Sequence, residues 1–525
     1  MIVPLTPLDF LERARRQYGE LEALVEGDRR LSYTEYAARC HALAAWLQSL
    51  PFWADLPGVE PDGSAQNGGG VAGPRVAYLC PNTVELLEAY YGVLLAGCVL
   101  VPLNIRLASA ELQTILDDCG ASVLVVHPSL AALADELRVP LRVDLGPTYE
   151  RGLADHAGSF VDRRVDDENE VCELFYTSGT TGLPKGAMLT HRNLATHAID
   201  AALSMSCTHR DVVLHTIPLF HVNGWGTPHW VTLLGARHVM LERWDPVEVL
   251  RLIEAEGVTR LHLVPTMASS LVVCDDLQNR NTSSLVQVTI GGSPPGPELL
   301  AELEDAFGCE VISGYGMTES APQMTKALTK RSHDDLPMAE QRRRRATTGL
   351  PNVGVELRVV DDSDLEVPAD DSTPGEIVVR SNHVMAGYWN NPEATAEVLR
   401  DGWLRTGDIA VVDAEGYVRI VDRKKDLIIS GGENISSVEV EQALCAHPSV
   451  LEAAVVGRAD ERWGEVPHAF VTLRPSAAPV DSLELTAFVG ERLARFKVPK
   501  GIEFLDELPK GGSGKILKSE LRRRT

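Results

Sequence analysis

The most informative stretch of the chain is Tyr176-Thr177-Ser178-Gly179-Thr180-Thr181-Gly182-Leu183-Pro184-Lys185-Gly186, which follows the apolar strand Glu173–Thr177. Glycines let a backbone approach a phosphate closely, hydroxyls and amides donate to its oxygens, and a lysine supplies positive charge. The loop differs from that of the P-loop enzymes, because Pro184 stands where G-x-x-x-x-G-K-[ST] requires glycine. Taken alone, it could also be a surface turn rich in Gly and Thr.

Further motifs follow this loop along the chain. Together they resemble, in order, the motifs of the adenylate-forming enzymes: acyl-CoA synthetases, peptide-synthetase adenylation domains and beetle luciferases. The resemblance runs from about residue 30 to the end of the chain. The matching segments are Ile217-Pro218-Leu219-Phe220-His221, Gly291-Gly292-Ser293-Pro294-Pro295, Gly314-Tyr315-Gly316-Met317-Thr318-Glu319, Thr406-Gly407-Asp408, Asp422-Arg423-Lys424-Lys425-Asp426 and Lys510-Gly511-Gly512-Ser513-Gly514-Lys515.

Length and charge limit what the chain can be. Its 525 residues exceed what a single hydrophobic core usually holds. The 74 acidic and 49 basic side chains give a net charge of −25, which argues against general binding to nucleic acids or anionic membranes. Any positive site for phosphates is therefore expected to be local.

The cysteine pattern and the apolar runs predict a cytoplasmic protein without a membrane span. The nine cysteines form no C-x-x-C pair, so they are expected to be reduced rather than joined in disulfides or bound to zinc. No signal peptide is evident, and the longest apolar run, Ala89–Leu103, is shorter than the ~20 residues that span a bilayer. A homodimer is possible on this reading.

The order of predicted elements indicates an α/β fold. Buried strands such as Val76–Cys80 alternate with helices such as Pro246–Glu256 and Pro297–Phe307, a rhythm typical of parallel sheets. Ser109 is the expected N-cap of a helix over 109–119. From Gly354, alternating strands and turns predict a β-rich part, including a hairpin over 409–420.

We therefore expect a large N-terminal domain of parallel α/β sheets plus a β-rich subdomain, with a small mobile α+β C-terminal domain. The first would cover residues 1–422, with the β-rich subdomain at 354–422, and the second 423–525. Residues 51–74 are rich in Gly and Pro and predict a flexible surface insertion.

The resemblance implies a nucleotide site built from several motifs. Hydroxyls and amides of the signature loop, with Lys185, would hold the β- and γ-phosphates of ATP. Tyr315 would face adenine, and Asp408, with Arg423 beside it, would accept from the ribose hydroxyls. The implied set is Thr177, Ser178, Gly179, Thr180, Thr181, Gly182, Lys185, Gly291, Gly292, Ser293, Gly314, Tyr315, Gly316, Met317, Thr318, Asp408 and Arg423.

Catalysis would add a magnesium ion, a lysine and CoA. Mg²⁺ takes few protein ligands beside phosphate oxygens, and Glu319 with Thr180 are the expected ones. Alternatively, Glu319 could be an acidic residue at the start of a helix, where it would interact favourably with the helix dipole. By resemblance, Lys515 bridges the acyl carboxylate and the α-phosphate. The small domain would pivot at Lys425, and backbone at Gly431 and Gly432 would then line the channel for the pantetheine arm of CoA.

The acyl pocket is expected at the segment that begins with His221. A catalytic part for His221 would be contact with the acyl carboxylate, since a carboxylate nucleophile needs no general base at neutral pH. Trp225 could line a fatty-acyl tunnel or close the pocket around a shorter or aromatic acid, and the sequence leaves both open. The pocket residues are His221, Val222, Asn223, Gly224 and Trp225.

The expected activity is that of an acid–thiol ligase, an ATP-dependent acyl-CoA synthetase. The first expectation for its substrate is a medium- to long-chain fatty acid. The alternatives are a short-chain or aromatic acid, or transfer of the acyl group to a carrier protein instead of CoA. An oxidative, luciferase-type activity and a non-catalytic nucleotide-binding protein stay as remote readings, the latter because Lys515, Glu319 and Asp408 are all present.

Overall fold

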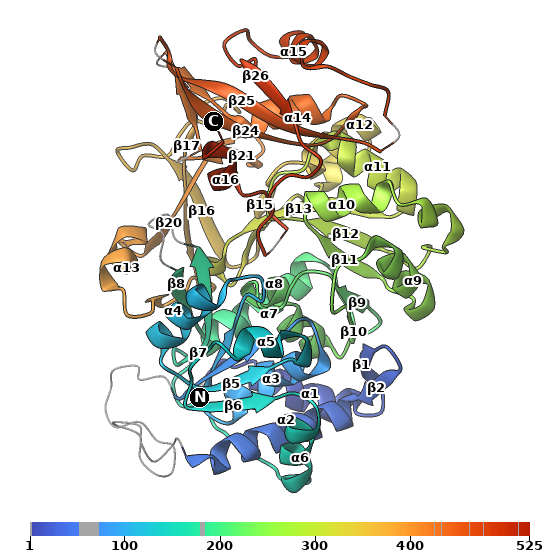
Figure 1. Cartoon of the computed structure of the whole chain (residues 1–525), viewed down its shortest axis with the longest axis vertical. Coiled ribbons are helices and arrows are strands. Elements are labelled where there is room, and N and C mark those ends of the chain that lie inside the picture. Colours follow the sequence, from blue (N-terminus) through green and yellow to red (C-terminus); the bar gives the residue numbers. More distant parts are fainter. Residues whose placement is uncertain are drawn as a thin grey trace.

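The computed structural model describes residues 3–51, 73–178, 184–424, 426–431, 433–460, 462–475, 477–512 and 514–524. The insertion predicted at 51–74 lies almost entirely outside these ranges. Mixed α/β sheets build the larger, N-terminal part of the molecule, and a smaller unit that includes the C-terminus sits at one end of it (Figure 1). None of the helices in the described ranges has the length and apolarity that crossing a membrane requires.

The first sheet carries the glycine-rich loop. Its central strands are parallel, and the loop joins the antiparallel pair β7 and β8. The strand order is β18 (Gly387–Tyr388), β8 (Pro184–Thr190), β7 (Val171–Ser178), β4 (Val99–Pro102), β3 (Arg75–Leu79), β5 (Ala121–Val126) and β6 (Leu141–Asp144).

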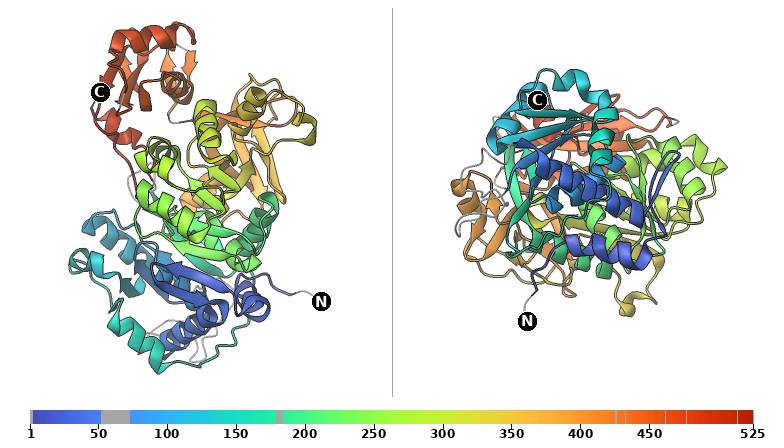
Figure 2. Two further views of the ribbon diagram at one scale, coloured as in Figure 1. Left: turned by 90° about the vertical axis from the view of Figure 1, so that its right-hand side faces the viewer. Right: turned by 90° about the horizontal axis from the view of Figure 1, so that it is seen from below.

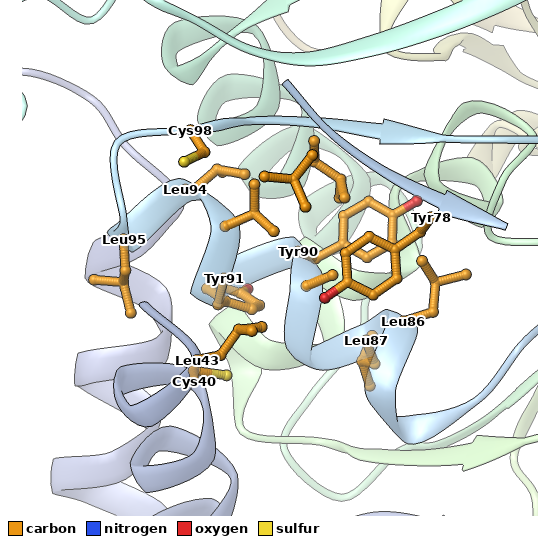
Figure 3. Close-up of a cluster of buried hydrophobic side chains, with 14 of the residues drawn as sticks. Cys40, Leu43, Tyr78, Leu86, Leu87, Tyr90, Tyr91, Leu94, Leu95 and Cys98 are labelled. Atoms are coloured by element: carbon orange, nitrogen blue, oxygen red, sulfur yellow. The ribbon is translucent and has the colours of Figure 1, made fainter. Parts of the chain in front are cut away.

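The helices of this first region pack into a core rich in tyrosine. Helix α3 (Val84–Leu95) is buried along its whole length and contacts α2 (Tyr33–Ser49). Tyr78, Tyr90 and Tyr91 lie among leucines in this core (Figure 3). Each buried hydroxyl needs a partner, and those of Tyr90 and Tyr91 donate to backbone carbonyls of the Leu219–Pro228 region. The core thereby fixes the segment that precedes and forms α8 (Val222–Leu234).

The second sheet positions most of the remaining motifs. Its strands β1 and β9–β13 are parallel where they pair, so the chain leaves β11, β12 and β13 at the same edge. The strand order is β15 (Leu350–Pro351), β14 (Gln323–Lys326), β13 (Glu310–Gly316), β12 (Gln287–Ile290), β11 (Arg260–Leu263), β9 (Val212–His215), β10 (Arg237–Met240), β1 (Glu22–Glu26) and β2 (Arg29–Ser32).

Helices flank this second sheet as the alternating pattern predicts. They include α7 (His191–Ser204), α9 (Pro246–Glu256), α10 (Pro265–Val272) and α11 (Pro297–Phe307). Parallel strands need such crossovers, which is why the sequence alternates between the two kinds of element. The α/β class expected from the sequence is confirmed.

A β-rich sheet and the C-terminal unit complete the molecule. The sheet contains β16 (Val355–Val360), β17 (Gly375–Ser381), β20 (Trp403–Val412), β19 (Leu399–Arg400) and β21 (Val418–Arg423). The C-terminal unit, orange to red in Figures 1 and 2, combines β22 (Ile428–Ser430), β23 (Glu433–Ile435), β24 (Val450–Asp460), β25 (Gly464–Leu473) and β26 (Gly501–Phe504) with α14 (Ser437–Cys445), α15 (Ser482–Gly490) and α16 (Lys518–Arg522).

Two local predictions need correction. Helix α4 (Ser109–Cys119) begins at Ser109 itself, so Ser109 is not its N-cap. The Glu111 carboxylate accepts from the backbone N–H of Ala108 at 3.0 Å, which satisfies this end of the helix without a serine cap. The predicted hairpin at 409–420 is also longer, because β20 extends back to Trp403 and places Asp408 inside a strand.

Candidate active site

The signature loop spans the tip of the β7–β8 hairpin. Thr177 pairs with Lys185 in this ladder. The Lys185 ammonium lies 5.2 Å from the centre of the Tyr388 ring, a cation–π distance. The remaining predicted phosphate ligands fall outside the described residues: Gly179, Thr180, Thr181, Gly182 and the side chain of Ser178.

Glu319 shares Tyr388 with Lys185. Glu319 belongs to the short 3₁₀ turn Thr318–Ser320 and is only 7% exposed. Its carboxylate accepts from the Tyr388 hydroxyl at 2.7 Å, and burial together with this negative charge raises the pKa of Tyr388. One tyrosine therefore touches both the loop cation and the carboxylate predicted to bind magnesium.

Sequence reasoning missed Tyr388. It lies in the two-residue strand β18, where it pairs with Ala187 of β8. The only local signal was the run Ala386-Gly387-Tyr388-Trp389, which carries no charge or phosphate-binding pattern. Its place beside the loop depends on pairing between segments about two hundred residues apart.

Asp408 forms a second polar cluster, with Tyr315 and Arg423. The Tyr315 hydroxyl donates to Oδ2 of Asp408 at 2.5 Å, and Nε of Arg423 lies 3.2 Å from Oδ1. The pairing register of β20 and β21 sets Asp408 opposite Arg423. Both carboxylate oxygens are thus engaged already, and each keeps a lone pair for a further donor such as a ribose hydroxyl.

The C-terminal tail brings Lys515 to the same place. The tail runs from the C-terminal unit onto the N-terminal part, where carbonyls of Gly511 and Gly514 accept from Arg106 and Thr266 (Figures 1 and 2). A Cβ on Gly292 would lie 3.0 Å from Cε of Lys515, so the glycine leaves room for this side chain.

The surroundings of Lys515 are charged and partly desolvated. Burial and the positive charge of Arg423 lower the pKa of Lys515 to about 8, although the carboxylates of Asp408 and Glu319 act in the opposite direction. The structure therefore brings Lys515, Arg423, Asp408 and Glu319 into one electrostatic neighbourhood, from segments separated by up to two hundred residues.

The turns after β12 and β13 form the wall around this group. The predicted residues here are Gly291, Gly292, Ser293, Gly314, Gly316, Met317 and Thr318, which lie at or just beyond the carboxyl ends of the two strands. Gly316 has no room for a side chain, because a Cβ there would lie 2.0 Å from the carbonyl oxygen of Pro322. Exposed edges of this kind are where ligands bind in open α/β sheets.

The predicted acyl pocket begins beside Lys515. Burial and the charge of Lys515 lower the pKa of His221 to about 3, so its imidazole is neutral near pH 7. A run of positive φ angles from Val222 to Gly226 follows it. The side chain of Asn223 is committed elsewhere, because its amide donates to the buried Glu173 at 3.1 Å.

Trp225 lies directly against the turn after β12. A Cβ on Gly291 would lie 2.9 Å from Cη2 of Trp225, so the ring fills the space that this glycine leaves. The ring also meets His262 of β11, with ring centres 6.0 Å apart and perpendicular planes. The indole, which is 8% exposed, thus packs against both the turn after β12 and His262.

Gly431, one of the two glycines predicted to line the CoA channel, makes its contacts within the C-terminal unit. Gly431 is exposed at the turn between β22 and β23, with φ +60°, and its N–H donates to the carbonyl of Trp463 at 2.7 Å. A Cβ there would meet the Trp463 ring at 2.7 Å. Lys425 and Gly432 fall outside the described residues. The arrangement therefore presents Lys515, and not Gly431, to the nucleotide motifs.

Among the described residues, no group of three or more His, Cys, Asp or Glu side chains is placed to hold a metal ion. The single carboxylate expected for magnesium does not require such a group, since Mg²⁺ keeps several waters and phosphate oxygens.

Comparison with known proteins agrees with these motifs. Residues 66–389 match the family model described as AMP-binding enzyme, and residues 439–515 match the AMP-binding enzyme C-terminal domain. The chain is 40% identical to a feruloyl-CoA synthase of Amycolatopsis sp over 98% of its own length and 97% of the relative's. It is 35% identical to the peroxisomal benzoate–CoA ligase of Arabidopsis thaliana, covering 99% and 93% of the two chains.

A solved structure extends the comparison to the fold. An anthranilate CoA ligase in complex with anthranoyl-AMP superposes with a TM-score of 0.88 at 26% identity, covering 100% of this chain and 98% of that one.

Proposed function

Because the chain belongs to the AMP-binding enzymes and is an acid–thiol ligase among them, we propose that it converts an aromatic carboxylic acid to its CoA thioester. The observation that carries the choice of acid is the Trp225 ring, which lies against Gly291 and His262 and would close the acyl pocket around a short or aromatic acid. The names of relatives point the same way, to feruloyl, benzoate and short acids. Our first expectation, a medium- to long-chain fatty acid, has less support than this alternative.

The first half-reaction joins the acid to AMP. A carboxylate oxygen attacks the α-phosphorus of ATP, the bond to the bridging oxygen breaks, and pyrophosphate leaves. Lys515 would stabilise the charge that gathers on the carboxylate and α-phosphate oxygens, and Lys185 would hold the departing phosphates. Asp408 and Tyr315 would orient the ribose and adenine so that the attack is in line.

The carboxylate of Glu319 is suited to bind a magnesium ion. Glu319 is buried, acts electrostatically on Lys515 and has one carboxylate oxygen bonded to Tyr388, so its other oxygen can serve as a single metal ligand. Glu319, with Thr180, would hold the ion. When bound, Mg²⁺ supplies charge neutralisation for the phosphates.

The second half-reaction needs a different arrangement. The thiol sulfur of CoA attacks the acyl carbonyl carbon, the bond to AMP breaks, and the thiol proton passes to solvent. We propose that residues 423–525 rotate about Lys425 after adenylation, which would remove Lys515 and bring the Gly431–Gly432 backbone to the pantetheine arm. A cytoplasmic location stays a prediction, as does a homodimer.

An acid panel tests the substrate proposal. Pyrophosphate release and CoA consumption are measured with benzoate, anthranilate, cinnamate, ferulate, butyrate, octanoate and palmitate, each with Mg·ATP and with or without CoA. The proposal expects kcat/KM to be highest for one of the first four acids, with one thioester formed for each pyrophosphate. A maximum at octanoate or palmitate would refute it, and a maximum at butyrate would favour a short-chain ligase.

A further inference from the structure

A pocket of about 560 Å³ opens at the end of the second sheet that is opposite the nucleotide motifs. Arg260, Gln287 and Glu310 line it at the first residues of β11, β12 and β13, whereas the nucleotide motifs follow the last residues of these strands. The end of α7 and the segment 350–353 form its other walls. None of the residues that line the pocket belongs to the predicted nucleotide, acyl or CoA sites.

Lys326 forms the inner end of this pocket. It is the last residue of β14, is only 1% exposed, and lines the pocket. Its Nζ has no hydrogen-bond partner among the described residues. A buried ammonium without a partner costs free energy, so such a group in a folded protein calls for a ligand or another explanation.

The charged groups around Lys326 are engaged elsewhere. Arg260 forms an ion pair with Asp211 at 2.9 Å, and Glu310 accepts from the Gln287 amide at 2.7 Å. Asp200 accepts from the Ser204 hydroxyl at 3.0 Å through Oδ1, whereas its buried Oδ2 has no hydrogen-bond partner among the described residues. The other titratable neighbours of Lys326 are Cys207, His197 and His262.

Burial lowers the pKa of Lys326 to about 7. The nearby carboxylates of Asp200 and Glu310 act to raise this pKa, but they do not offset the desolvation. The ammonium form is therefore under-compensated, and an anion brought into direct contact would stabilise it.

The outer rim of the pocket has three exposed apolar side chains, together with the exposed Ser206 and Glu310. Leu203, Val286 and Val353 line it and are 61%, 54% and 64% exposed. Exposed apolar side chains gathered around one opening favour a ligand with an apolar part. The pocket volume also falls in the range of about 300–1,000 Å³ that is usual for small-molecule sites.

We propose that this pocket is a second small-molecule site, which binds an amphipathic monocarboxylate with its carboxylate against Nζ of Lys326 and its apolar part against Leu203, Val286 and Val353. Contact with the carboxylate favours the protonated lysine, so binding takes up a proton near neutral pH. Affinity is then greatest below about pH 7 and falls as the free enzyme's Lys326 loses its proton above that pH.

Calorimetric titration with hexanoate, and with hexanamide as the uncharged control, tests the site in the full-length enzyme. Wild-type protein is expected to bind hexanoate at least tenfold more tightly than hexanamide. Lys326→Met, which keeps the length of the side chain and removes the charge, should lose this preference. Heats measured at pH 7.5 in buffers of different ionisation enthalpy should reveal the uptake of a proton.

A second pair of variants keeps the test independent of any folding defect in Lys326→Met. Leu203→Asp places a negative charge at the rim and should weaken hexanoate binding at least tenfold, while kcat and KM for ATP stay within twofold of wild type. Ile199→Asp is the matched control, because Ile199 is an exposed residue of the same helix that does not line the pocket. Absence of hexanoate binding at millimolar concentrations, or binding unchanged in Lys326→Met and Leu203→Asp, would overturn the proposal.

Discussion

Single side chains explain how an acidic protein can hold a triphosphate. The chain carries a net charge of −25, yet Lys185, Arg423 and Lys515 converge on the nucleotide motifs beside the carboxylates of Glu319 and Asp408, while Asp426, which also acts on Arg423, is paired with Arg522. Each carboxylate is bound by a tyrosine hydroxyl, which fixes its position without adding charge. The acidic composition implied that any positive site for phosphates would be local, and this cluster of basic side chains is such a site.

Tyr388 offers a test of this arrangement at the level of one hydroxyl. Tyr388→Phe removes the donor to Glu319 but keeps the ring beside Lys185, whereas Tyr388→Leu removes both contacts. We expect Tyr388→Phe to raise the Mg²⁺ concentration needed for half-maximal pyrophosphate release, and to lower kcat about tenfold, because a free Glu319 is less well positioned. Tyr388→Leu should also raise KM for ATP. Equal effects of the two variants would show that the hydroxyl has no separate part.

The lowered pKa of Lys326 predicts how the free energy of unfolding depends on pH. Its pKa is lowered from 10.5 to about 7 in the folded chain, so between these values the unfolded chain binds more protons and stability rises with pH. Below pH 7 the penalty is complete, on the order of 5 kcal/mol. Lys326→Met should therefore unfold at a higher temperature than wild type, with a larger difference at pH 7 than at pH 9.5. Thermal unfolding at both pH values measures this, and a difference that grows with pH would contradict it.

At the scale of elements, the sequence predicts where helices begin and end, but it does not predict which strands pair with one another. Helices α9 and α11 match their predicted bounds, because Pro246 and Pro297 start them and left-handed Gly257 and Gly308 follow their ends. No comparable signal placed Tyr388 beside the loop. That contact depends on strand pairing across distant segments, which a single sequence does not encode locally.

The same limit applies within the site. The motifs predicted which residue types would be needed, but the bond of Tyr315 to Asp408 and the register of Asp408 against Arg423 come from tertiary pairing. Asn223 shows the opposite case, a residue that was predicted to contact the substrate but is bonded elsewhere. Its position in the pocket segment suggested a substrate contact, yet its amide turns to Glu173.

The segment that begins α8 carries the prediction about substrate size. Trp225 has a φ of +66°, which glycine adopts easily, so Trp225→Gly removes the ring without backbone strain. We expect kcat/KM for aromatic acids to fall and that for octanoate to rise, changing their ratio by about 10- to 100-fold. Coupled assays with both acids measure this ratio. An unchanged ratio would mean that Trp225 does not limit the length of the pocket.

Gly291 supplies the opposing variant for this prediction. Gly291→Ala should lower kcat/KM for every acid, because the new methyl group would lie 2.9 Å from the Trp225 ring and 3.3 Å from the carbonyl oxygen of Gly314. In the Trp225→Gly background the same change should be better tolerated, since only the backbone contact remains. Strictly additive effects would argue against direct contact between the two positions.

At the scale of the whole molecule, the C-terminal unit is held by few polar contacts. Arg474 pairs with Glu302 of α11 at 2.9 Å, and the Gln442 amide reaches the carbonyl of Pro295 at 3.5 Å. Partly exposed ion pairs of this kind contribute about 0.2–1 kcal/mol. Such weak attachment is compatible with the proposed rotation, and it leaves the tail around Lys515 as the contact specific to adenylation.

Lys515→Ala tests this division of labour between the two half-reactions. Loss of the ammonium should slow adenylation by about 10²–10³-fold, because it removes the cationic donor that Lys515 places beside Gly292. Conversion of supplied acyl-AMP to thioester should stay within about threefold of wild type, since the proposed rotation removes Lys515 before the thiol attacks. Single-turnover measurement of each half-reaction, with the exposed Lys500→Ala as a control, separates the two effects. Equal loss in both half-reactions would mean that Lys515 remains at the reacting atoms throughout, and that the arrangement seen here serves both steps.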